Sequence, residues 1–227
     1  MSFRSWKQLP PEMRNKKVKY YYAVLSKKKT ELVVIRLADI VLALFLLIVF
    51  FLPGVVISVL IVMDSSGGPI FLQKRIKQYG ESFYIIKFRT MRVREADDRD
   101  NLVGKTGRVT KVGKILRKYR LDEIPQLLNI IMGDMTFVGT RPEVARFVRE
   151  YTEEMFATLL LPPGLTSNTS IIYKDEERLL AGAKDSDLEY VRSILPVKMK
   201  YNLEEILNIG ILYNMRILLK TVKAVLL

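Results

Sequence analysis

The hydrophobic positions of this chain gather in one long run near its start. Residues 40–63 contain no charged side chain, and as one continuous helix they would extend about 36 Å, enough to cross a hydrocarbon core of roughly 30 Å. Pro53 and Gly54 fall near the middle, where proline removes a helical hydrogen bond and clashes with the preceding turn. The pattern therefore predicts a membrane-inserted helix with a break in its middle.

Beyond this run, apolar and polar positions alternate in shorter segments. Residues 70–73 and 82–91 have the pattern of two strands joined by a turn, and residues 144–161 have the spacing of an amphipathic helix. Residues 187–227 are again helical in pattern, with Pro196 as a break. Strands and helices alternate too rarely for a doubly wound sheet. We expect a helix-rich α/β domain of the α+β kind, with a small sheet and surrounding helices.

Charge and composition narrow the chemistry. The formal net charge is +13, from 37 Lys and Arg against 24 Asp and Glu, and the chain has neither cysteine nor histidine. Disulfides, thiol nucleophiles and histidine acid–base catalysis are therefore excluded for these residues. The positive excess indicates an anionic partner, which could be nucleic acid, an acidic membrane face or a phosphorylated substrate.

Much of the positive charge precedes the apolar run. In residues 1–36, Glu12 and Glu31 oppose a much larger number of Lys and Arg. This segment is either a solvated, partly disordered arm or a juxtamembrane arm attracted to anionic lipid, and its position favours the second. Positive charge also follows the run, within residues 74–77, so both flanks match the cytoplasmic side. Such symmetry favours a hairpin, but the residues alone leave a spanning and a re-entrant helix both open.

The strongest candidate for chemistry is the adjacent pair Asp122 and Glu123. Pro125 follows the pair and indicates the first turn of a helix, which Gly133 can close. For an isolated pair of this kind, an N-capping Asp followed by a first-turn Glu is the ordinary interpretation. Arginines flank the pair in sequence at positions 117, 120 and 141.

Other candidates are weaker. Lys87 and Arg89 lie two residues apart in a predicted strand and would share a face, where cations are usually just solvated. Asp98 and Asp100 form a DxD pair that could hold a metal, although this spacing is a weak signal. The last stretch, residues 203–227, is apolar around much of a helix with a basic side. It is either a buried core helix or, as we favour, a helix lying in the membrane interface.

Three long stretches carry a family resemblance: GPIFLQKRIKQYGESFYIIKFRTM (68–91), TKVGKILRK (110–118) and LRKYRLDEIPQLLNIIMGDMTFVGTRPE (116–143). Together they resemble the bacterial sugar transferase family, the monotopic polyprenyl-phosphate phosphoglycosyl transferases, over about residues 32–227. Two places depart from the family's usual pattern. Thr140 stands where proline is usual, and Ser167-Asn168 stand where many members have glycine and then tryptophan or leucine. The second departure bears on the preference for sugar or nucleotide.

The resemblance implies a definite activity. Such an enzyme transfers a sugar-1-phosphate from a UDP-sugar to polyprenyl (undecaprenyl) phosphate and releases UMP, beginning an exopolysaccharide, O-antigen or other glycoconjugate. Asp122 would be the nucleophile and Glu123 a Mg²⁺ ligand, with Asp122 sharing the metal. The expected phosphate-binding cations are Lys87, Arg89, Arg117 and Arg141. Because both substrates are polyanions, attack on phosphorus needs such charge neutralisation.

The resemblance also implies a place in the cell. A basic juxtamembrane arm (1–36) and a re-entrant membrane helix (37–64) would hold a catalytic domain (65–227) on the cytoplasmic face of the bacterial inner membrane. That domain would carry membrane-interface helices. Its partners would be membrane lipid, both substrates and downstream glycosyltransferases, with no nucleic acid.

Two other classes of protein remain as alternatives. A membrane-tethered, metal-dependent glycosyltransferase would use Asp98 and Asp100 and release UDP instead of UMP. A membrane-anchored polyanion-binding protein would use the charge of +13 to contact phosphates, although no recognised nucleic-acid motif is present.

Overall fold

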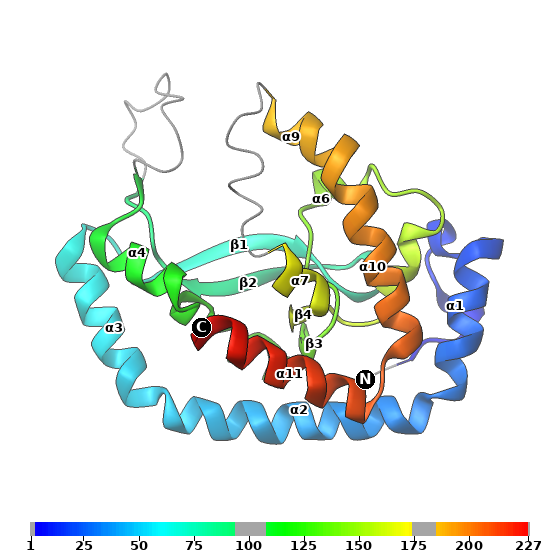
Figure 1. Cartoon of the computed structure of the whole chain (residues 1–227), viewed down its shortest axis with the longest axis horizontal. Helices are drawn as coiled ribbons and strands as arrows, with labels where there is room; N and C mark the ends of the chain where they lie inside the picture. Colours follow the sequence, from blue (N-terminus) through cyan, green and yellow to red (C-terminus); the bar gives the residue numbers. More distant parts are fainter. Residues whose placement is uncertain (1–2, 94–107, 174–184, 227) are drawn as a thin grey trace.

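The computed structural model describes residues 3–93, 108–173 and 185–226. Within them the chain is rich in helices and has two separate two-stranded sheets near its centre (Figure 1). The helix-rich architecture predicted from the sequence is confirmed, but two small sheets replace the single sheet that we expected.

The apolar run forms two helices that meet at an angle. Helix α2 (Lys29–Val49) runs along one edge of the molecule, and α3 (Phe51–Asp64) turns away from its end (Figure 1). The break falls at Phe50, because Pro53 has no N–H to continue the ladder and is tolerated in the first turn of α3. Among the described helices, α2 is the one that is long and apolar enough to cross a membrane.

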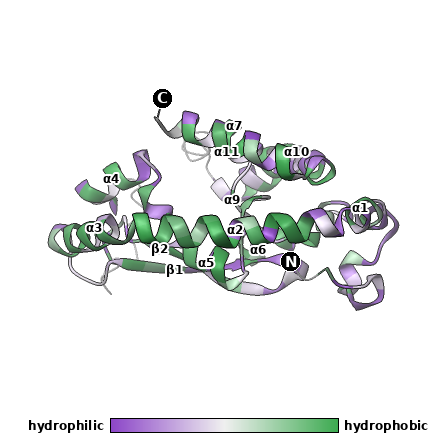
Figure 2. Cartoon of the chain, turned by 90° about the horizontal axis from the view of Figure 1, so that it is seen from below, coloured by the Kyte–Doolittle hydropathy of each residue, from purple (hydrophilic) through white to green (hydrophobic). Residues whose placement is uncertain are grey.

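Much of the surface of these two helices is hydrophobic. Large apolar side chains are exposed along α2 and α3, including Leu37, Val41, Phe45, Phe51 and Leu52. Figure 2 shows hydrophobic colouring over most of the length of both helices. A continuous apolar surface of this kind marks a site of membrane or protein contact.

The residues before α2 are folded onto the rest of the protein. Helix α1 (Lys16–Lys27) follows two short 3₁₀ turns, η1 (Trp6–Gln8) and η2 (Pro11–Met13). Apolar side chains of this segment are buried in the same core as residues far along the chain: Leu9, Met13, Val18 and Leu25 with Leu160, Leu195 and Met199. Residues 3–27 are therefore an ordered part of the core, and the alternative of a partly disordered arm does not hold for them.

The first sheet is a hairpin that carries one of the candidate cations. Strands β1 (Ile70–Ile76) and β2 (Ser82–Phe88) pair antiparallel, with Phe71 opposite Lys87. The turn passes through η3 (Gln78–Gly80), where Tyr79 adopts a φ of 61°. The predicted hairpin is confirmed, with its first strand three residues longer than the pattern indicated.

The second sheet joins two distant segments in parallel. Strand β3 (Thr136–Val138) pairs with β4 (Gly164–Thr166). The two chains approach so closely that a Cβ on Gly164 would lie 2.2 Å from the backbone nitrogen of Gly139. A larger residue at position 164 would therefore push these strands apart.

Three short elements lead to the candidate site. They are α4 (Lys111–Lys118), the 3₁₀ turn η5 (Leu121–Glu123) and α5 (Gln126–Met132). Asn129 of α5 is fully buried and bridges the edge of β2, accepting from the Ile86 N–H at 3.0 Å and donating to the Tyr84 carbonyl at 2.9 Å. Gly133 closes α5 with a φ of 92°, as predicted.

The segment predicted as one amphipathic helix over 144–161 is different. Helix α6 (Ala145–Val148) is a single short turn, and η6 (Met155–Leu160) is a 3₁₀ segment whose side chains are mostly buried. The prediction was wrong because η6 packs against both α1 and α10, so nearly all of its side chains, including the polar Thr158, are buried. Helical spacing does not distinguish such a core segment from an amphipathic helix.

The C-terminal part is helical, with its break in another place. After α7 (Asn168–Ile172) come α9 (Ser186–Glu189), a π-helical turn η7 (Tyr190–Ile194), α10 (Leu195–Asn208) and α11 (Ile211–Leu226). Pro196 does not interrupt the helix, because it occupies the first turn of α10. The chain instead turns at Gly210, where a Cβ would lie 2.8 Å from Oε1 of Glu31.

Helix α11 is partly a core helix. Ile217 and Asn214 are buried, whereas Leu212, Leu219 and Val222 are exposed along another side. Its predicted position in the membrane interface remains a prediction.

Candidate active site

Asp122 and Glu123 lie in a tight turn between two helices. Arg120, with a φ of 56°, takes the left-handed conformation that ends α4 and starts η5. Both carboxylates are buried, each with 8% of its surface exposed. Neither η5 nor α5 has a side-chain capping bond at its start. Asp122 therefore does not cap η5 or α5, and the N-capping interpretation is wrong.

Glu123 lies in a cluster of cations from three parts of the chain. Its Oε1 accepts from Arg141 Nη2 at 2.9 Å and from Lys87 Nζ at 3.0 Å, and Arg120 Nη1 lies at 3.7 Å. Burial alone would raise the pKa of Glu123, but Arg141, Lys87 and Arg120 outweigh burial and hold it well below its usual range. Glu123 is therefore a permanent anion that orders the cations around it.

Asp122 has a different environment although it is the next residue. None of the hydrogen bonds between described residues ends on its carboxylate. Burial and the neighbouring charge of Glu123 raise the pKa of Asp122, against the opposing influence of Lys87, Arg117 and Arg120. The result is a carboxylate of increased basicity that faces cations and receives no hydrogen bond from a described residue.

Two of the predicted cations, Lys87 and Arg117, are held near the carboxylates by contacts with neighbouring side chains. Lys87 projects from β2 and is mostly buried, with 18% of its side chain exposed. Burial lowers the pKa of Lys87 and the adjacent Glu123 opposes that shift, so the ammonium depends on this carboxylate. Arg117 near the end of α4 donates from Nε to the Thr90 hydroxyl at 2.9 Å, which steers its guanidinium.

Arg89 is the one predicted phosphate ligand that the structure places elsewhere. Its guanidinium is buried and donates to the carbonyls of Ser65, Gly67 and Gly68, at 2.8, 3.0 and 2.7 Å. These groups form the turn that follows α3. Arg89 thus stabilises the turn by which the chain leaves the apolar segment. It does not share the face of Lys87, because strand β2 ends at Phe88 and the predicted alternation stops there.

The structure adds one cation that sequence reasoning named as a neighbour without giving it a role. Arg120 approaches Glu123 from three residues earlier in the chain. Its spacing from Glu123 was a usable signal, since residues three apart share a face of a helical turn. Asp98 and Asp100, proposed for a rival metal site, lie outside the described residues.

A divalent cation fits the donor set of this turn. The three cation contacts of Glu123 among the described residues all end on Oε1, which leaves Oε2 to other ligands. Together with the Asp122 carboxylate it offers the oxygen donors that Mg²⁺ prefers, which it usually supplements with water and phosphate oxygens. The described residues contain no group of three or more acidic, His or Cys side chains that could hold a metal without a substrate.

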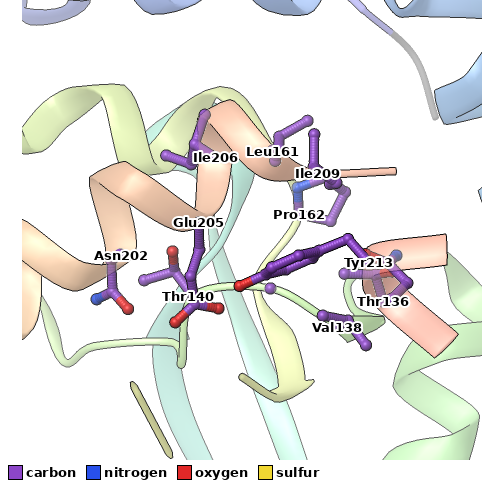
Figure 3. Close-up of a pocket in the computed structure, with 12 residues that line it drawn as sticks. Thr136, Val138, Thr140, Leu161, Pro162, Asn202, Glu205, Ile206, Ile209 and Tyr213 are labelled. Carbon is purple, nitrogen blue, oxygen red and sulfur yellow. The ribbon is translucent and has the colours of Figure 1, made fainter. Parts of the chain in front are cut away.

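A small pocket lies away from the two carboxylates, between the β3–β4 pair and the junction of α10 and α11 (Figure 3). Thr140, Glu205 and Tyr213 converge in it, and the buried Asn202 has an amide oxygen without a hydrogen-bond partner. Its cavity volume is about 20 Å³, which is room for about one water molecule. The pocket is too small for either expected substrate.

Comparison with known proteins identifies the family. The model of the family described as bacterial sugar transferase matches residues 30–227. The chain belongs to the bacterial sugar transferase family. Helix α1 and the turns before it lie ahead of the matched range.

Relatives named as sugar transferases are similar to this chain over more than half of its length. A sugar transferase of Bacillus subtilis, EpsL, is 38% identical over 134 residues, covering 58% of this chain and 64% of the relative. The UDP-N-acetylgalactosamine-undecaprenyl-phosphate N-acetylgalactosaminephosphotransferase of Aeromonas hydrophila is 30% identical over 174 residues, covering 74% and 38%. The UDP-glucose:undecaprenyl-phosphate glucose-1-phosphate transferase of Klebsiella pneumoniae is 34% identical over 170 residues, covering 69% and 36%. The matches thus span less than two thirds of each of these relatives.

Proposed function

We propose that this protein transfers a sugar-1-phosphate from a UDP-sugar to polyprenyl (undecaprenyl) phosphate and releases UMP. The relatives from Aeromonas hydrophila and Klebsiella pneumoniae are named for this reaction. The observation that carries the proposal is the contrast between two adjacent buried carboxylates. Glu123 is surrounded by cations, and Asp122 is basic and free of hydrogen bonds from described residues.

Asp122 acts as the nucleophile in the first half of the reaction. A carboxylate oxygen of Asp122 attacks the sugar-bearing phosphorus of the UDP-sugar. A new P–O bond forms to Asp122 while the P–O bond to the UMP oxygen breaks, and the electron pair leaves with UMP. The product on the protein is an aspartyl-phosphosugar.

Polyprenyl phosphate completes the transfer. One of its phosphate oxygens attacks the same phosphorus, and the bond to Asp122 breaks. Polyprenyl diphosphate-sugar leaves and the carboxylate is regenerated. Dividing the transfer in this way predicts ping-pong kinetics.

Lys87, Arg117, Arg120 and Arg141 supply the charge that both steps need. Four cations face the two carboxylates and bring positive charge to the place where the phosphates of either substrate would bind. Glu123 would hold Mg²⁺, shared with Asp122 and the substrate phosphates. Bound there, Mg²⁺ would neutralise charge on the transferring phosphoryl group.

We also propose that α2 and α3 form a re-entrant hairpin with both flanks on the cytoplasmic face of the inner membrane. Residues before α2 and residues after α3 are buried in one shared core, for example Val18 and Leu25 with Leu160 and Met199. Lys28, directly before α2, donates to the carbonyls of Leu207 and Ile209. A spanning path would place a bilayer between groups that pack together here, so these contacts support the hairpin.

The decisive experiment follows the phosphosugar. Purified wild-type protein receives a radiolabelled UDP-sugar without lipid, across a panel of sugars. We expect UMP release of about one equivalent and a peptide containing Asp122 heavier by one phosphosugar, with turnover once polyprenyl phosphate is added. Release of UDP would instead favour the glycosyltransferase alternative, and a requirement for both substrates before any UMP appears would contradict the covalent intermediate.

A further inference from the structure

We propose that Glu143 is a positioning residue that sets the place of Arg141, and through it the geometry of phosphate binding at Asp122 and Glu123. This inference rests on the proposed function of Arg141 as a phosphate ligand. Glu143 does not touch Glu123. It is two residues beyond Arg141, in a segment that the structure holds from two sides.

The hairpin holds the first side of this segment. The backbone N–H of Ile76 at the end of β1 donates to the Glu143 carbonyl at 2.9 Å. Arg75 Nη1 donates to the Pro142 carbonyl at 3.1 Å. Both residues after Arg141 therefore have their carbonyl groups bonded to the sheet that also carries Lys87.

A buried polar network holds the second side, and we call it the Glu143 network. The Tyr190 hydroxyl and Lys198 Nζ both reach Oε1 of Glu143, the lysine at 3.4 Å, and Lys198 also donates to the Tyr190 hydroxyl at 2.8 Å. The exposed fractions are 8% for Glu143, 2% for Tyr190 and 5% for Lys198. The network ties the segment after Arg141 to η7 and α10.

The π-helical turn gives this network its register. Seven residues make almost two turns of an α-helix, so residues seven apart are nearly aligned, whereas residues eight apart are offset by about 80°. Tyr190 and Lys198 are eight apart, but η7 (Tyr190–Ile194) takes up an extra residue in its wider turn. Both side chains can then face Glu143. Such π turns are frequent at functional sites.

Burial makes the Glu143 network a firm tether. An ion pair at the surface, such as Arg146 with Asp187, holds its partners weakly because water competes. Removing one partner of a buried pair leaves a desolvated charge, so the pair resists opening. Arg141 itself is 36% exposed in its side chain. The anchored backbone that follows Arg141 therefore helps to fix the place of this partly exposed side chain.

The consequence is that the two cations proposed to bind one phosphate, Lys87 and Arg141, are positioned by the same hairpin. Lys87 comes from β2, and β1 of the same hairpin anchors the segment of Arg141. Glu123 Oε1 receives both cations within 3.0 Å. A shift of about 1 Å in such an arrangement can cost on the order of a hundredfold in rate.

A double-mutant cycle on the whole chain in detergent tests this role. The variants are Glu143→Gln, Arg141→Ala and the two combined, with kcat/KM measured for UMP release. We expect a loss of about a hundredfold for Arg141→Ala and of about tenfold for Glu143→Gln. If Glu143 acts through Arg141, the combined variant will be no slower than Arg141→Ala alone.

The outcomes separate this inference from the proposed function. A further tenfold loss in the combined variant, or a wild-type rate in Glu143→Gln, would overturn the positioning role. A wild-type rate in Arg141→Ala would overturn the phosphate-binding role of Arg141, and the inference with it. Leu203→Ala, a buried apolar change on α10, is the matched control for lost stability, and its effect on the rate should add to that of Arg141→Ala. Should Glu143→Gln not be recovered folded, Tyr190→Phe takes its place in the cycle with the same criteria.

Discussion

Asp122 and Glu123 are neighbours with equal exposure of 8%, yet their pKa values shift in opposite directions. Cations from β2, the Arg141 segment and the preceding turn meet at Oε1 of Glu123, while no described residue donates a hydrogen bond to Asp122. One carboxylate therefore organises the site and the other is left available for chemistry. The predictions below follow from this difference.

The two carboxylates should respond to neutralisation with opposite changes in stability. Asp122→Asn removes a buried charge whose pKa is already raised, so we expect a higher melting temperature and no turnover. Glu123→Gln leaves Lys87 without its carboxylate and should lower the free energy of unfolding by about 2–3 kcal/mol, below the value for a fully buried pair because Arg120 and Arg141 are partly exposed. Thermal unfolding in detergent measures both. Equal changes of stability in the same direction for the two variants would contradict the difference between the two carboxylates.

The dependence of the first chemical step on pH should report Asp122. Its pKa is raised by burial and by Glu123, so the reactive carboxylate is lost as the pH falls through a value above that of an ordinary Asp. Arg117 opposes this shift. Arg117→Gln should therefore move the acid limb of the rate of phosphosugar adduct formation to higher pH. The measurement is made at saturating UDP-sugar, and a limb that does not move would remove Arg117 from the surroundings of Asp122.

Arg89 should matter for stability and not for substrate binding. Its guanidinium holds three carbonyls of the turn after α3, and the ammonium of lysine cannot reproduce that fork. We expect Arg89→Lys to lower the melting temperature while KM for the UDP-sugar stays within about twofold of wild type, an effect of less than roughly 0.5 kcal/mol. A large increase in KM without loss of stability would restore Arg89 as a phosphate ligand.

The hairpin topology can be tested with single cysteines, since the native chain has none. Ser5 and Ser66 are exposed and flank the apolar helices. In intact cells, Ser5→Cys and Ser66→Cys should both be protected from an impermeant thiol reagent and both react after lysis. Labelling of one from outside would show a spanning path. Pro53→Ala restores the missing N–H and should favour a straighter helix, so it should increase the fraction with such asymmetric labelling.

Local patterns in the sequence were enough for several elements. The apolar run with Pro53 in its middle predicted a broken membrane helix, and α2 and α3 meet three residues before that proline. The hairpin of β1 and β2 and the closing Gly133 were also predictable. Each of these elements depends on the backbone conformations open to Pro or Gly, or on side-chain periodicity within a few residues. Both can be recognised in the sequence.

The long family motifs were likewise enough to predict the candidate site residues that lie close together in sequence. Asp122, Glu123 and their flanking arginines stand within one stretch of chain. The contact between Lys87 and Glu123 could not be predicted in this way, because the two residues are 36 positions apart. They meet at 3.0 Å because α5 packs on the edge of β2 through Asn129. Periodicity carries no information about such a contact.

Tertiary packing alone decided the remaining features. The alternating pattern of the sequence places Arg89 on the same strand face as Lys87. Strand β2 ends at Phe88, however, and the Arg89 guanidinium donates to backbone carbonyls of the turn at 65–68. The segment 155–160 has helical spacing, but burial against α1 and α10 makes it a 3₁₀ core piece. The opposite states of Asp122 and Glu123 likewise come from cations that converge from distant elements. By itself the sequence indicated which residues are candidates for the chemistry, and the fold decided which of them meet, because Coulomb interactions and burial depend on distances in space and not on separation along the chain.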